Sequence, residues 1–248
     1  MFSSTGNSKP AVLGATLVTL GVAVILLRPL EHRIGVFAFP MAWRVEQLTA
    51  AAGRGSTLGL LGGMRSTVAS GCWLRANLAW ERRDLAATTA LIELTVAADE
   101  RPLYFWLNGA RMLACDLPEW RLAGSAPAAF RPRVNEEQAQ LALRFLEKGL
   151  RWHGADPALY IEMANIHLRR RGDAGSAAHC YRLAAEQPGA PYYAARIHAE
   201  LLQELDRPLE ALAWLRQILP GLPGDDPLAR REVVIERIKA LEQELAAR

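Results

Sequence analysis

Several features that define common classes of protein are scarce in this chain of 248 residues. Its three cysteines, Cys72, Cys115 and Cys180, are an odd number at wide spacing, which is typical of buried thiols and not of a disulfide framework. One pair could still form a bridge in an oxidising compartment. An excess of charge is lacking too, because 29 lysines and arginines face 26 aspartates and glutamates. This near-neutral balance gives no general case for nucleic-acid binding, so we expect no nucleic-acid partner.

The chain also lacks the groupings of side chains that catalysis or metal binding requires. None of its five histidines has a second histidine one helical turn away, the usual spacing of metal ligands on a helix. No serine has the flanking glycines of a nucleophile elbow. The glycines between residues 53 and 63 are not followed by the Gly-Lys-Ser/Thr of a phosphate loop. We therefore expect no enzyme activity, no metal and no cofactor.

Long apolar runs are absent with one exception near the N-terminus. After a polar tail at residues 1–10, residues 11–27 form an apolar run without a charged side chain. A helix over this run spans roughly 25 Å, the short end for a membrane helix. We predict an uncleaved, single-pass membrane anchor. A cleaved signal peptide and a buried core helix are the alternatives, but the first favours a shorter apolar core and the second a one-sided apolar stripe.

Charges around this run favour one orientation of the anchor. Arg28, Arg33 and Arg44 follow the run, whereas only Lys9 and the amino terminus precede it. By the positive-inside rule this bias favours a cytoplasmic main domain. Residues 28–63 are expected to form a juxtamembrane connector, whose aromatic side chains either lie at the membrane interface or pack on the domain.

The strongest pattern in the sequence is an internal repeat between residues 158 and 223. A triplet of small and large apolar residues, Ala177, Tyr181 and Ala184, recurs at one constant offset as Ala211, Leu215 and Ile218. Each copy predicts two helices: 158–171 and 174–186 in the first, 192–205 and 209–219 in the second. Gly172-Asp173 breaks the first pair, since glycine adopts the left-handed conformation that closes a helix. The offset matches the period of about 34 residues that is typical of one class of stacked helical hairpins.

Weaker copies of the same hairpin precede this region. Over residues 64–120 we predict helices at 64–83, 85–98 and 103–115, the last ending at Asp116-Leu117-Pro118. The expected apolar positions of the first two helices are Met64, Val68, Cys72, Ala76 and Trp80, and then Ala90, Leu94 and Ala97.

A loop is expected at residues 121–134, followed by further repeats over residues 135–224. Asn135 with Gln138 forms a capping box that predicts a helix start. This helix carries a third triplet, Ala142, Leu146 and Gly149.

Residues 225–248 predict a capping helix that begins at Asp226 with Pro227 in its first turn. Its apolar seam consists of Val234, Ile238, Leu241 and Leu245. End repeats must cover the last apolar face of a stack, which is the role that we expect of this helix.

The triplets and the turn before them resemble the tetratricopeptide repeat family. This resemblance implies an all-α fold, a right-handed α-solenoid of helix hairpins, here preceded by an N-terminal transmembrane helix. It also implies that the first helix of each pair lines a groove for a protein or peptide partner.

One stripe of residues on these first helices is the candidate partner-binding site. Its members are Leu159, Glu162, Ile166 and Arg169 in the first copy, Tyr193, Arg196, Glu200 and Gln203 in the second, and the adjoining Arg170. Their spacing of three and four residues places them on one helix face. We expect this face to lie away from the packing residues Ile161, Ala164 and Leu168. A solvated face without a partner is the alternative.

These features predict a membrane-anchored scaffold for protein–protein interaction. The alternative is an accessory subunit of a membrane enzyme, or of an envelope-assembly or secretion complex.

Overall fold

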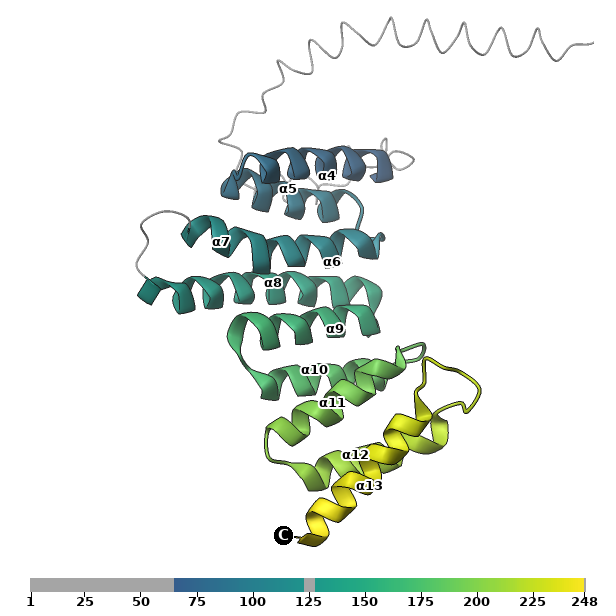
Figure 1. Ribbon diagram of the computed structural model, residues 1–248. Coiled ribbons are helices and arrows are strands. Elements are labelled where there is room, and N and C mark those ends of the chain that lie inside the picture. Colours follow the sequence, from purple (N-terminus) through teal and green to yellow (C-terminus); the bar gives the residue numbers. More distant parts are fainter. Residues whose placement is uncertain (1–64, 123–127, 248) are drawn as a thin grey trace, which may run out of the picture. The chain divides into compact units, whose positions relative to one another are not determined.

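The computed structural model describes residues 65–122 and 128–247, and every regular element in these ranges is a helix (Figure 1). The all-α class predicted from the sequence is therefore confirmed. The predicted anchor at 11–27 and the connector at 28–63 lie outside the described residues. Within the described ranges, no helix has the length and apolar character needed to cross a membrane.

The helices follow one another as hairpins, and each packs chiefly against its neighbours in the chain. In order they are α4 (Arg65–Glu81), α5 (Leu85–Ala98), α6 (Leu103–Arg111), the π-helical segment η1 (Met112–Asp116), α7 (Leu117–Leu122), the short η2 (Ala128–Phe130), α8 (Arg131–His153), α9 (Pro157–Ile166), the π-helical η3 (His167–Arg171), α10 (Ala174–Ala185), α11 (Tyr192–Glu204), α12 (Pro208–Ile218), the short η4 (Leu219–Gly221) and α13 (Arg231–Ala247).

Short side chains define the turns between the helices of the repeat region. Gly172 ends η3 in the left-handed conformation, with φ of 65°, as the sequence predicted. Asp173 then accepts a hydrogen bond from the backbone N–H of Ser176 and caps α10. In the second copy Asp206 adopts the left-handed conformation, with φ of 54°. Aspartate tolerates this conformation better than most residues, so the turn forms without glycine.

The helix predicted to end at Asp116-Leu117-Pro118 instead continues to Leu122, and this prediction was wrong. Proline lacks an N–H and its ring clashes with the carbonyl four residues earlier. The chain accommodates Pro118 by widening into η1, where the N–H of Leu117 bonds to the carbonyl of Met112. The wider turn explains how a proline is tolerated within one uninterrupted helical run.

Two other helix starts differ from the prediction. Helix α8 begins at Arg131, so Asn135 and Gln138 lie inside it and do not form a capping box. Helix α13 begins at Arg231 because Asp226 caps a turn and not a helix, accepting from the N–H of Leu228 at 2.8 Å. In both cases a polar residue suited to capping indicated a helix start several residues away from the observed one.

The apolar face of the first hairpin also differs from the prediction. Helix α4 buries Ala69, Trp73 and Ala76, whereas Val68 and Trp80 are exposed. A strict spacing of four residues turns by about 40° per step around a helix of 3.6 residues per turn, so five such residues cannot share one face. In α5 the buried residues are Thr88, Ile92, Thr95, Val96 and Ala98, not the triplet Ala90, Leu94 and Ala97.

The later triplets are buried as expected, except that Ile218 is half-buried, and the core explains their small members. The rings of Trp106 and Phe145 lie 4.8 Å apart between α6 and α8. A Cβ atom at Gly149 would lie 3.2 Å from the Trp106 ring, and one at Gly109 would lie 2.8 Å from Ile92. Glycine at these two positions therefore allows the helices to approach each other closely.

Candidate partner-binding site

The predicted stripe divides into a buried part and an exposed part. Leu159, Glu162 and Ile166 are only 0%, 6% and 2% exposed, so the expectation that they face outward is wrong. Leu159 and Ile166 belong to the core cluster shared with α6 and α8. The expected packing residues Ile161 and Leu168 are half-buried against the cluster around α10. Helix α9 is thus covered by other helices on two faces. The predicted partner-binding stripe forms one of these covered faces.

An open pocket of about 390 Å³ lies where the end of this stripe meets α6 and η1. Its lining residues come from α6, η1, α9 and η3: Arg111, Cys115, Glu162, Asn165, Ile166, Arg169 and Arg170. Four of them, Glu162, Ile166, Arg169 and Arg170, were predicted as partner-binding residues. The structure therefore brings the first-copy part of the predicted set together around a hollow, with the exception of Leu159.

The carboxylate of Glu162 and the amide oxygen of Asn165 in this pocket already accept hydrogen bonds from other side chains. Arg111 donates to Glu162 through Nε, and its Nη2 lies at the same 2.9 Å from the same carboxylate oxygen. The hydroxyl of Tyr181 donates to Oδ1 of Asn165 at 2.9 Å. A buried carboxylate requires such a partner, because an unpaired charge in the interior is strongly unfavourable.

The arginines of η3 are satisfied to different degrees. Arg170 donates through Nη2 to Asn135 at 2.7 Å and to Glu119 at 3.4 Å, while its Nε is buried without an acceptor. Arg169 is exposed and makes no hydrogen bond or ion pair within the described ranges. The pocket therefore presents positive charge and free donors to solvent.

The pKa of Cys115 reflects these charges. Burial of its sulfur raises the pKa of the thiol above the usual value, although the residue as a whole is exposed. The positive charges of Arg170 and Arg169 lower it in part, and the carboxylates of Asp116 and Glu162 raise it further. The thiol is accordingly protonated at neutral pH, which argues against a role as a nucleophile.

Tyr193 of the second copy does not line this pocket. Its ring is 42% exposed on α11. Burial is the main cause that raises the pKa of the Tyr181 hydroxyl, followed by the electrostatic effect of Tyr193, whereas Arg169 lowers it. The residues of the predicted set that line the pocket therefore all come from the first copy.

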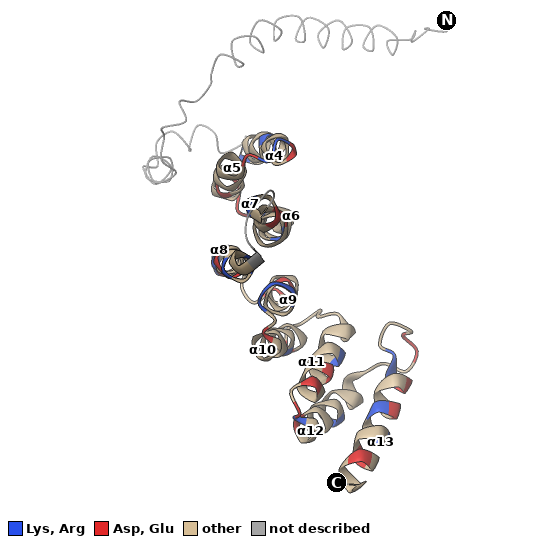
Figure 2. Cartoon of the chain, turned by 60° about the vertical axis from the view of Figure 1, so that its left-hand side comes forward, with Lys and Arg blue, Asp and Glu red and all other residues tan. Residues whose placement is uncertain are grey.

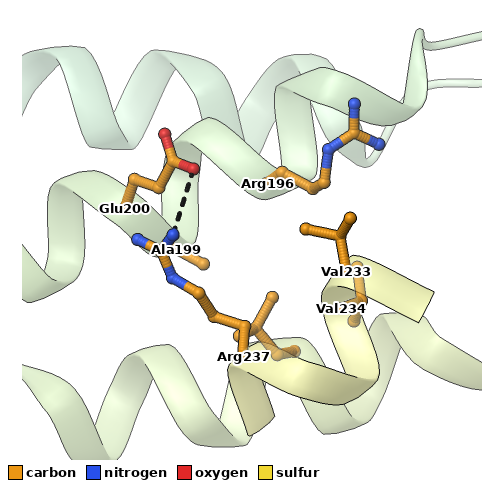
Figure 3. A pocket seen from close by; sticks show the side chains of 7 residues that line it. Arg196, Ala199, Glu200, Val233, Val234 and Arg237 are labelled. Atoms are coloured by element: carbon orange, nitrogen blue, oxygen red, sulfur yellow. Dashed lines mark ion pairs between the residues drawn. The ribbon is translucent and has the colours of Figure 1, made fainter. Parts of the chain in front are cut away.

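Two residues of the second-copy stripe, Arg196 and Glu200, contact the C-terminal part of the chain. Arg196 donates to the carbonyls of Leu228 and Ala229 at 3.3 and 3.0 Å, and Glu200 pairs with Arg237 of α13 at 3.5 Å (Figure 3). The space left between α11 and α13 is a cavity of about 20 Å³. Gln203 bonds to a carbonyl of its own helix.

Sequence reasoning missed Arg111, Cys115 and Asn165 as pocket residues. Arg111 lies 51 residues before its partner Glu162, and this separation is unrelated to the period of the repeat. One signal was available: a glutamate within an otherwise apolar stripe requires a nearby cation.

Figure 2 shows positions of both charges on the described helices, for example side by side along α13. No group of three metal-ligating side chains occurs in the ranges 65–122 and 128–247. His198 is buried, where Nδ1 bonds to the carbonyl of Ala178 and the ring packs edge-on against Trp214.

Comparisons with protein-family models, with curated proteins and with solved structures gave no match to this chain. The tetratricopeptide resemblance therefore depends on the residues of the repeat themselves.

Proposed function

We propose that this chain is a membrane-anchored scaffold for protein–protein interaction. Residues 11–27 hold it in a bilayer, and a right-handed, tetratricopeptide-like solenoid presents the first helices of its hairpins to a protein or peptide. The observation that carries this proposal is the pocket between α6 and α9. Its carboxylate and amide oxygen are bonded internally, whereas the exposed Arg169 has no acceptor among the described residues.

The surroundings of the pocket suit a protein partner. Arg169 is exposed at the pocket and Tyr193 offers an exposed ring on α11, and tyrosine and arginine are enriched at interface hot spots. Arg196, another residue of the predicted stripe, is engaged with carbonyls of the chain itself. We therefore assign the contact surface to Arg169 and Tyr193 rather than to Arg196.

Site-specific photo-crosslinking of the full-length chain in its native membrane tests this proposal. A photo-reactive phenylalanine replaces Tyr193, and a matched probe replaces Trp152, which is 63% exposed on α8 and does not line the pocket. We expect a discrete crosslinked product from position 193 and none of that size from position 152. Equal products from both positions would overturn the assignment of the surface.

An accessory subunit is the second candidate, and α4 supplies the observation that favours it. Leu74 and Leu78 of this helix are 65% and 51% exposed, one turn apart. Neighbouring apolar side chains of this size mark surfaces that a permanent partner covers. Co-purification from mild detergent at fixed stoichiometry would support this candidate, whereas transient and salt-sensitive capture would support the scaffold.

A further inference from the structure

We infer that the pocket between α6 and α9 binds the carboxylate side chain of an acidic protein segment. This inference rests on the proposed function, since it names the chemistry that the partner brings to that site. It follows from the charges that line the pocket, from the hydrogen-bonding groups left over there, and from the distribution of charge over the neighbouring helices.

The first argument is the balance of charge. Arg111 is neutralised by Glu162 and Arg170 is partly neutralised by Glu119, with N–O distances of 2.9 and 3.4 Å. Arg169 remains without an ion pair among the described residues. Among the side chains that line the pocket, this leaves one positive charge without a partner. One such charge matches one carboxylate, whereas a phosphate carries up to two negative charges at neutral pH.

The second argument is the kind of hydrogen-bonding group that the pocket leaves unused. Because Oδ1 of Asn165 accepts from Tyr181, the amide nitrogen is the part of Asn165 that remains as a donor. The guanidinium of Arg169 supplies further donors and no acceptor. A ligand at this place must therefore supply acceptors, and a carboxylate supplies two oxygens in one plane.

The third argument concerns the size of the ligand. Nucleic acid presents a regular series of negative charges, which a continuous basic face would match. Arg169, Arg170 and Arg171 follow one another at the end of η3, but Arg170 pairs with Glu119 and Arg171 pairs with Glu136. The positive charge there that has no ion pair among the described residues is therefore local to Arg169. A single local charge suits one acidic side chain carried on a peptide better than a regular polyanion.

Cys115 provides a reporter inside the pocket. Iodoacetate carries a carboxylate and iodoacetamide is its neutral counterpart, so the ratio of their alkylation rates at Cys115 measures the preference of the pocket for a carboxylate. Changes in the pKa of the thiol alter both rates equally and cancel in this ratio. Peptide mass spectrometry of the full-length chain in detergent quantifies Cys115 separately from Cys72 and Cys180.

Arg169→Gln is the test variant, and Arg144→Gln is its matched control. Arg144 is also an exposed helical arginine, but it does not line the pocket. We expect Arg169→Gln to lower the iodoacetate-to-iodoacetamide ratio by about two- to fivefold, the range of a single exposed charge pair. Arg144→Gln should leave the ratio unchanged. An equal ratio in the wild type and Arg169→Gln would overturn the inference.

A competition experiment tests the peptide directly. Hexaglutamate should slow alkylation of Cys115 by both reagents in the wild type but not in Arg169→Gln, and hexalysine should have no effect. Stronger protection by inorganic phosphate than by hexaglutamate at equal concentration would overturn the carboxylate assignment.

The crosslinking at position 193 is independent of these rates. If position 193 crosslinks to a partner but Arg169→Gln leaves the iodoacetate-to-iodoacetamide ratio unchanged, the carboxylate inference is rejected and the scaffold proposal stands. If Arg169→Gln changes this ratio but position 193 gives no crosslinked partner, the scaffold proposal is rejected and the preference of the pocket for a carboxylate stands.

Discussion

Helices α9 and α11 carry the same stripe one repeat apart, yet the two stripes have different surroundings. In α9, Leu159 and Ile166 pack into the core shared with α6 and α8. In α11, the counterpart of Leu159 is the exposed Tyr193, and Arg196 contacts the turn before α13. The repeat period determines which residues share a helix face. The elements packed against that face determine whether it becomes core or surface.

The same contrast applies to the two glutamates of the stripe. Glu162 is buried and paired with an arginine from a different hairpin, whereas Glu200 is exposed and paired with Arg237 of the terminal helix. One ion pair therefore joins two hairpins through a buried carboxylate and a half-exposed arginine, and the other joins two exposed side chains. Substitutions of these two glutamates should separate these two roles.

The largest difference is expected between Leu159→Ala and Tyr193→Ala. Removing the fully buried Leu159 leaves a cavity in the core, and we expect a loss of about 2–5 kcal/mol in the free energy of unfolding. Tyr193→Ala removes a ring at the surface and should change stability by less than about 1 kcal/mol. Urea denaturation followed by circular dichroism measures both values. Equal losses would mean that the two stripes have the same surroundings.

Much of the fold in the repeat region was predictable from the sequence because local signals agreed there. Gly172 closes η3 in the predicted left-handed conformation, the break at Gly172-Asp173 lies where it was predicted, and the triplet at Ala177, Tyr181 and Ala184 is buried. Glycine, a capping carboxylate and a helical apolar period each act over a few residues. Such effects do not depend on distant parts of the chain.

The pocket was less predictable because it depends on contacts between distant residues. The pairing of Arg111 with Glu162 requires the relative placement of two hairpins, and the insertion between them interrupts the period. The π turn before Pro118 moves Cys115 round the helix, which no regular α-helical pattern anticipates. The sequence therefore indicated Arg169 and Arg170 but not the residues across the pocket from them.

The glutamates provide the next test of the comparison. Glu162→Ala removes a buried, paired carboxylate and should cost about 1–3 kcal/mol, because the half-exposed Arg111 recovers water in its place. Glu200→Ala should change stability by less than about 1 kcal/mol, as is usual for exposed ion pairs. A double-mutant cycle with Arg111→Ala isolates the pair from the packing of the glutamate stem. No coupling in that cycle would contradict a structural role for the ion pair.

The second helices of the two copies should lose similar stability when a buried alanine is enlarged. This similarity would sharpen the contrast with the first helices. Ala177 and Ala211 are both completely buried. Replacing either with Leu overpacks the helix contact and should cost about 1–3 kcal/mol. Ala213→Leu, at an exposed position of α12, is the control and should leave the melting temperature nearly unchanged. A marked effect at only one of the two buried sites would show that the copies pack differently in this layer as well.

The helix caps of the two copies should differ in how their contribution to stability depends on pH. Hydrogen bonds from Ser176 are the main cause that lowers the pKa of Asp173, and the charges of His167 and Arg171 lower it further. The pKa of Asp173 in the folded state is lower than its value of 3.8 in the unfolded state. The ionised carboxylate therefore stabilises the fold at pH values above 3.8. This stabilisation is lost as the pH falls through the folded pKa.

We therefore expect Asp173→Ala to cost about 1 kcal/mol at pH 7, with the difference from wild type disappearing in acid below the folded pKa. The equivalent residue of the second copy, Arg207, makes no side-chain cap and pairs with Glu210 on the surface. Arg207→Ala should alter stability by less than about 1 kcal/mol. Thermal unfolding of both variants between pH 7 and pH 2 measures these effects. A difference at Asp173 that persists at pH 2 would exclude the cap as its source.

The smallest effect on stability is expected where the two copies are made identical. Arg169→Gln introduces the residue found one repeat later at Gln203, and as a surface substitution it should change the free energy of unfolding by less than about 0.5 kcal/mol. Its electrostatic effect should still be measurable, because the charge of Arg169 lowers the pKa of Cys115. Without that charge the pKa of the thiol rises, so the pH profile of Cys115 alkylation by iodoacetamide should shift to higher pH. Gln203→Arg, the reverse exchange, should leave that profile unchanged. A shift with Gln203→Arg would mean that the second-copy stripe also reaches the pocket.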